Sequence, residues 1–198
     1  MTSLTIHNQK YEYLSWEDLG QDIFNLAKQI IESGAEFDRV VALAKGGLAF
    51  SRSMTDFLGI KKLSTIQIEF YSGINEAAPT PVITQSLPVS IKGERVLIFD
   101  DIVDSGETIN LAVRYMKQHG ASAVATAALL NKPWAKHQAD FKARSSEAWV
   151  IFPNEIRETI NLLSQMWQEK GDSADKITQQ LLEIGFSKAE VELFANLK

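Results

Sequence analysis

Two adjacent aspartates and the short loop after them are the residues of this chain best suited to chemistry. The apolar run Val96–Phe99 leads into Asp100 and Asp101, and the loop Asp104–Thr108 follows two residues later. A short apolar run bounded by polar residues predicts a buried strand. In open α/β sheets, ligands bind beyond the carboxyl ends of such strands. We therefore expect these acids to stand at the edge of a binding site.

The loop after the acids has the residue types that bind a phosphate group. The apolar spacing that follows predicts a helix beginning within the loop, and a helix N-terminus offers unpaired N–H groups and the positive end of the dipole. Gly106 would let the backbone approach a phosphate closely, and Ser105 and Thr108 add hydroxyl donors. Because carboxylates repel phosphate, Asp100 and Asp101 should face ribose hydroxyls or Mg²⁺ instead.

Taken singly, these residues have ordinary structural explanations, since Asp104 or Ser105 can simply be an N-cap. As a unit, the segment resembles the 5-phosphoribosyl-pyrophosphate (PRPP) signature of type I phosphoribosyltransferases. It lacks the Gly-Lys-Ser/Thr ending of a Walker A loop and the G-x-G-x-x-G of a dinucleotide site. The resemblance implies that Asp100 and Asp101 bind the ribose hydroxyls, directly or through Mg²⁺. It also implies a 5′-phosphate loop made of Asp104, Ser105, Gly106, Glu107 and Thr108.

A second anion site is predicted at Lys45-Gly46-Gly47, which follows the apolar run Val40–Ala44. A turn of this kind aims backbone N–H groups at an anion, and Lys45 adds a charge, although Gly-Gly after a strand is often only a tight turn. Hypoxanthine, guanine and xanthine phosphoribosyltransferases have a similar turn, which binds pyrophosphate. That resemblance also implies an Ala44–Lys45 peptide bond that is cis or switchable.

The remaining candidates would bind a base. Lys132 is a donor suited to a 6-oxo group, Trp149 supplies a flat stacking surface, and the backbone around Val150 can pair with ring edges. A Trp in an apolar run is also a common core residue. Lys132-Pro133 and the Trp149 segment resemble those of 6-oxopurine enzymes, especially the xanthine-guanine and archaeal forms. Asn154 departs from that pattern, because a Trp often stands there.

The resemblance implies transfer of ribose 5-phosphate from PRPP to hypoxanthine, guanine or xanthine in purine salvage, with a nucleoside monophosphate and pyrophosphate as products. Asp104 is the expected proton acceptor for the base. The activated ribose must be shielded from water, and the segment Tyr71–Leu87, rich in proline and small residues, is predicted to be a long loop that serves as a lid. Tyr71 and Ser72 would contact the ligand when it closes.

Strand-like and helical patterns alternate along the chain, which favours an α/β fold with a mostly parallel sheet flanked by helices. The resemblance implies the type I phosphoribosyltransferase fold, with a small hood at about 131–153. We expect one catalytic domain over 1–170 and a helical C-terminal extension over 171–198, with breaks at Gly171 and Gly185.

Composition narrows the function classes further. The 198 residues include no Cys and 3 His, which excludes disulfides, thiolate metal sites and Cys nucleophiles. No signal peptide or membrane-spanning run is apparent, so the expected location is the cytoplasm.

Two alternatives stay open. One is a phosphoribosyltransferase for adenine, orotate or a pyrimidine. The other is a PRPP- or nucleotide-binding transcriptional regulator on the same fold, for which the net charge of −5 gives no support. The habit of the family suggests a homodimer or homotetramer.

Overall fold

The computed structural model describes residues 2–71 and 80–195, which divide into two compact units. The larger unit spans Gly20–Ser146, and the smaller combines Met1–Leu19 with Glu147–Lys198. The boundary falls inside helix α1 (Trp16–Glu32).

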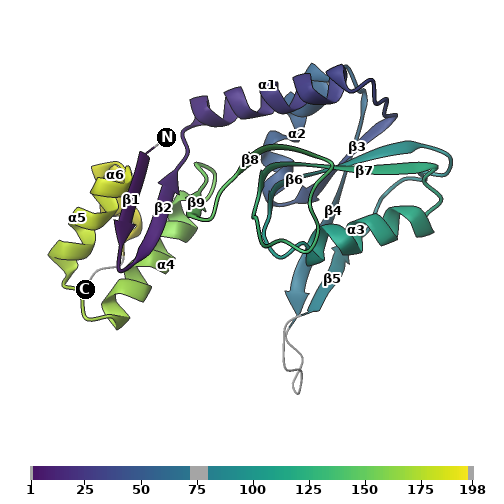
Figure 1. Cartoon of the computed structure of the whole chain (residues 1–198). Helices are drawn as coiled ribbons and strands as arrows, with labels where there is room; N and C mark the ends of the chain where they lie inside the picture. Colours follow the sequence, from purple (N-terminus) through teal and green to yellow (C-terminus); the bar gives the residue numbers. More distant parts are fainter. Residues whose placement is uncertain (1, 72–79, 196–198) are drawn as a thin grey trace. The chain divides into compact units, whose positions relative to one another are not determined.

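The larger unit is built on a six-stranded sheet in the order β5-β4-β3-β6-β7-β8 (Figure 1). All neighbouring strands are parallel except β4 and β5, which are antiparallel. The mostly parallel α/β sheet predicted from the sequence is thereby confirmed. Its strands are β3 (Arg39–Ala44), β4 (Lys62–Tyr71), β5 (Thr80–Gln85), β6 (Arg95–Val103), β7 (Ala123–Asn131) and β8 (Phe141–Ser145).

Helices cover both faces of this sheet, which explains the continuous apolar runs Val40–Leu43 and Val96–Phe99 in its central strands. Helix α2 (Gly46–Phe57) connects β3 to β4, and α3 (Glu107–Gln118) connects β6 to β7. These crossovers run in opposite directions along the sheet, so right-handed connections place the two helices on opposite faces (Figure 1). One core cluster includes Val41, Leu43, Val96, Ile98, Ile109 and Met116.

Successive strands are added in one direction from β3 and in the opposite direction from β6. The candidate site lies at this point of the sheet. These two strands are hydrogen-bonded neighbours, with Ala42 registered against Phe99. Their carboxyl ends therefore open at the same point of the sheet edge. In open α/β sheets such a switch point forms the crevice that receives a ligand. Both anion-binding turns predicted from the sequence follow these two strands.

The segment after β4 corrects one sequence-based expectation. Tyr71–Leu87 was predicted to be a continuous loop, yet Thr80–Gln85 forms strand β5. Its partner is β4, with Phe70 registered against Pro81. Proline is tolerated there because β5 is an edge strand, on which a missing N–H need not break the ladder. Tyr71 itself ends β4, and Ser72 lies outside the described residues.

The smaller unit pairs a three-stranded sheet with helices. Strands β1 (Thr2–Ile6) and β2 (Gln9–Tyr13) form an antiparallel hairpin, and β9 (Trp149–Ile151) lies parallel to β2. The helices are α4 (Ile156–Glu169), α5 (Ala174–Ile184) and α6 (Lys188–Phe194), so the predicted breaks at Gly171 and Gly185 are confirmed. Buried side chains, among them those of Tyr11, Ile151, Trp167 and Leu181, form its core. Within residues 2–71 and 80–195, no helix combines the length and the apolar character needed to cross a bilayer.

Candidate functional site

A pocket of about 280 Å³ opens at the carboxyl end of β6. This volume is near the lower limit of small-molecule pockets, about 300 Å³. The loop after β6 is open to solvent at Asp104 and Ser105. The pocket is lined by residues of β4, of the end of β6 and of the segment that leads into α3: Phe70, Asp100, Ile102, Val103, Asp104, Ser105, Gly106, Thr108 and Ile109.

The two leading acids are buried near the end of β6, and Asp100 lines this pocket. Asp100 and Asp101 are only 9% and 5% exposed. The Asp101 N–H donates to Asp100 Oδ1 over 3.0 Å, and the Ile102 N–H donates to Asp101 Oδ1 over 2.8 Å. Burial raises the pKa of Asp100 well above its usual value, and the neighbouring Asp101 charge raises it further. Burial likewise raises the pKa of Asp101. The protein around the pair thus disfavours the ionised form of both acids.

The Lys45-Gly46-Gly47 turn packs directly against these acids. A Cβ on Gly46 would overlap both carboxylate oxygens of Asp101, and a Cβ on Gly47 would lie 2.9 Å from the Asp100 Cα. Only glycine fits at either position. The Ala44–Lys45 peptide bond is cis, as the sequence analysis expected. Lys45 stands exposed at the N-cap of α2, a helix with no acidic residue in its first turn. The turn therefore presents a cation and a helix N-terminus beside the acid pair.

The loop before α3 has the geometry of an anion cradle. Gly106 is the N-cap of α3, and its φ of +86° lies in the left-handed region that favours glycine. Gly106 has no side chain with which to cap the N–H groups of the first helical turn. The Glu107 N–H donates to Ser105 Oγ over 3.2 Å. Thr108 lines the pocket beside this turn. Such a helix start can bind a phosphate through its N–H groups.

The segment after β7 was not recognised from the sequence as part of the site, apart from Lys132. It runs along the loop after β6. The Lys132 N–H donates to the Val103 carbonyl over 2.9 Å, and the Lys136 N–H donates to the Ser105 carbonyl over 3.0 Å. Trp134 Nε1–H donates to Asp104 Oδ1 over 2.9 Å. The register of Val103 against Asn131 explains the arrangement, because both strands end together.

The candidate base-binding residues belong to different units. Lys132 is in the larger unit and is 5% exposed. Trp149 and Val150 are in the smaller unit, on β9, an edge strand whose backbone pairs on one side with β2. The half-buried Trp149 ring packs against Tyr11, with 6.2 Å between ring centroids. The role of these three residues at a base stays a prediction.

Asp100 and Asp101 fit a divalent cation. Two adjacent, buried carboxylates give hard oxygen ligands, and the burial that raises both pKa values disfavours their ionised forms, a cost that a bound cation would offset. Across 2–71 and 80–195, no cluster of three or more His, Cys, Asp or Glu side chains is arranged to hold a metal ion. A cation here would need further ligands from water and from substrate oxygens, which is how Mg²⁺ is commonly held at phosphates.

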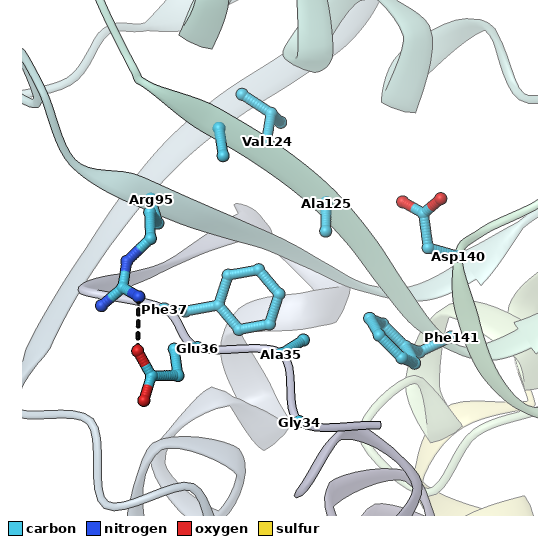
Figure 2. Close-up of a pocket in the computed structure, with 10 residues that line it drawn as sticks. Gly34, Ala35, Glu36, Phe37, Arg95, Val124, Ala125, Asp140 and Phe141 are labelled. Carbon is cyan, nitrogen blue, oxygen red and sulfur yellow. Dashed lines mark hydrogen bonds and ion pairs between the residues drawn. The ribbon is translucent and has the colours of Figure 1, made fainter. Parts of the chain in front are cut away.

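A larger pocket, of about 520 Å³, lies at the opposite edge of the sheet (Figure 2). Its residues precede β3 or stand at the starts of β6, β7 and β8, and Phe37 and Phe141 contribute apolar walls. Its polar groups are already engaged. The Arg95 guanidinium pairs with Glu36 and Asp38, and the Asp140 carboxylate accepts from Thr126. The pocket at the carboxyl ends of the strands is therefore the better candidate site.

Comparison with known proteins identifies the family of this chain. A model of the phosphoribosyl transferase domain matches residues 10–158. A xanthine-guanine phosphoribosyltransferase of Gluconobacter oxydans is 28% identical over 152 residues, covering 77% of this chain and 87% of that protein. One from Nitratidesulfovibrio vulgaris is 30% identical over 159 residues, covering 78% and 92%. The crystal structure of a purine phosphoribosyltransferase from Pyrococcus horikoshii superposes with a TM-score of 0.67 at 33% identity, covering 72% of this chain and 93% of that one. The chain belongs to the phosphoribosyltransferase family.

Proposed function

We propose that this enzyme transfers ribose 5-phosphate from PRPP to a 6-oxopurine base, releasing pyrophosphate and a nucleoside monophosphate for purine salvage. One juxtaposition carries the proposal: the Lys45-Gly46-Gly47 turn packs against Asp100 and Asp101, and Asp100 lines the same pocket as the loop Asp104–Thr108. PRPP has a phosphate at each end of a ribose, and this arrangement offers one anion site on each side of a hydroxyl- or cation-binding centre. The names of the relatives support a purine as the acceptor.

In the proposed reaction, a bond forms between a purine nitrogen and the anomeric carbon while the bond from that carbon to the pyrophosphate oxygen breaks. Lys45 and the N–H groups of Gly46 and Gly47 would stabilise the charge that gathers on the departing pyrophosphate. The loop Asp104–Thr108 would hold the 5′-phosphate, and Asp104 would accept the proton that the purine nitrogen loses.

The Asp100–Asp101 pair is the proposed binding place for the ribose hydroxyls, directly or through Mg²⁺. When bound, Mg²⁺ would neutralise charge on the pyrophosphate. On the base side, Lys132 is proposed to donate to the 6-oxo group and Trp149 to stack on the ring, with the Val150 backbone meeting the ring edge. Tyr71 and Ser72 keep their proposed role in closing the site.

Pyrophosphate release tests the proposal. The chain is incubated with PRPP and Mg²⁺, with hypoxanthine, guanine, xanthine, adenine or orotate added singly. We expect release with at least one 6-oxopurine and little with adenine or orotate. Release with adenine or orotate alone would replace the acceptor class. No release with any base, together with tight binding of RNA or DNA, would favour a regulator on this fold.

A further inference from the structure

Trp134 is an exposed aromatic residue, yet both its indole N–H and its ring face have partners in the protein. It is 56% exposed, so core packing does not account for its position. Its indole Nε1–H donates to Asp104 Oδ1 over 2.9 Å. The Lys132 ammonium lies over its ring, 5.3 Å from the centroid. One side chain thus contacts two groups that are proposed to face the base.

The fold makes this contact by bringing two strand ends together. Strands β6 and β7 are parallel, and Val103 is registered against Asn131 at their carboxyl ends. The residues that follow each strand therefore leave the sheet at the same edge. Backbone hydrogen bonds from Lys132 to Val103 and from Lys136 to Ser105 fix the two segments beside one another, on either side of Trp134.

We propose that Trp134 is a positioning residue that holds Asp104 and Lys132 for the base, an inference that rests on the proposed function. The indole N–H is a donor only, so it can orient a carboxylate but cannot take a proton from the base. By occupying Oδ1 it leaves Asp104 Oδ2 for the purine proton. The face of the ring attracts the Lys132 ammonium and restricts where that flexible side chain can lie.

Two substitutions separate the two contacts. Trp134→Phe keeps a ring face and removes the N–H donor, whereas Trp134→Gln keeps an N–H donor and removes the ring. We expect Trp134→Phe to lower kcat about tenfold, the loss expected when a hydrogen bond to a charged group is removed. The KM for PRPP should stay within about twofold, because no phosphate contact is touched. Trp134→Gln should retain most of kcat and raise the KM for the base about threefold. Trp16→Phe, at another exposed tryptophan, is the matched control and should leave both constants unchanged.

A double-mutant cycle tests whether Trp134 acts through Asp104. In an Asp104→Asn background, Trp134→Phe should change kcat less than about twofold, because the group that it positions has lost its role. Fully additive effects, or an unchanged kcat in Trp134→Phe alone, would overturn the inference while leaving the proposed function intact. If the wild-type chain released no pyrophosphate with any base, both proposals would fall. Thermal melting of each variant shows that it is folded, which the exposure of Trp134 leads us to expect.

Discussion

The backbone of Gly46 lies against the carboxylate of Asp101 so closely that a methyl group on Gly46 would overlap both of its oxygens. Gly46 follows β3 and Asp101 lies near the carboxyl end of β6, and these neighbouring strands end at the switch point of the sheet. The turn proposed for pyrophosphate and the acids proposed for ribose and Mg²⁺ are thereby one packed unit. A displacement of either should disturb the other.

Gly46→Ala should therefore impair activity severely. Its Cβ can be accommodated only if the turn or Asp101 moves, and a shift of about 1 Å at a catalytic site can cost about 10²-fold in rate. Steady-state kcat/KM for PRPP checks this. Gly20→Ala is the matched control, because Gly20 is within α1 and a Cβ there meets nothing within 4 Å. That change should leave kinetics unchanged and stabilise the helix by about 0.5–1 kcal/mol. A fully active Gly46→Ala enzyme would contradict the packed unit.

Gly106→Ala should weaken PRPP binding and lower stability together. The residue has φ +86°, and a Cβ there would come within 2.6 Å of the His137 backbone nitrogen. Gly59→Ala separates the two effects, because Gly59 has φ +66° but an open environment. The control should lose only about 1–2 kcal/mol of unfolding free energy from the backbone conformation. Gly106→Ala should lose more than that and should raise the KM for PRPP. Equal losses in denaturant melts would show that contact with His137 is unimportant.

Asp104→Asn should reduce kcat by about 10²–10⁴-fold, the usual contribution of a general base. The amide keeps an acceptor oxygen for Trp134 and is almost the same shape, so the loop should retain its structure. The KM for PRPP should change much less than kcat. Asp175→Asn, at an exposed acid in the first turn of α5, serves as the control. An unchanged kcat would remove Asp104 from the chemistry.

The parts of the candidate site that the sequence pointed to are local. The apolar run Val96–Phe99 and the acids after it form one continuous segment, so a strand and the loop at its carboxyl end could be read together. The cis bond before Lys45 was expected from the resemblance to related turns, and the structure contains it.

What the sequence did not predict depends on neighbours that are distant along the chain. Pro81 in a run of turn-forming residues suggested a loop, and only its place on an edge strand explains why a strand forms there. The hairpin before α1 turns at His7 and Asn8, both with positive φ, without the glycine that usually marks such a turn. Trp134 and Asp104 meet across 30 positions because β6 and β7 share a register, a pairing that no local pattern encodes.

Asp100→Asn should stabilise the folded protein at neutral pH while lowering its activity. Burial and the adjacent Asp101 raise the pKa of Asp100 above its ordinary value of 3.8. The folded state therefore holds a proton more tightly than the unfolded state, and the ionised side chain opposes folding once the pH rises above the ordinary value. The wild-type chain should lose stability as the pH rises from the ordinary pKa of 3.8 to the raised pKa of the folded state. An amide at position 100 removes this loss. The advantage of Asp100→Asn in melting temperature should be present at pH 8, should shrink as the pH falls, and should be nearly gone below about 4. Asp56→Asn is the control, because Asp56 forms an exposed ion pair with Arg52 that should contribute little. Equal melting temperatures of wild type and Asp100→Asn at pH 8 would show that the ionised Asp100 side chain does not destabilise the folded protein.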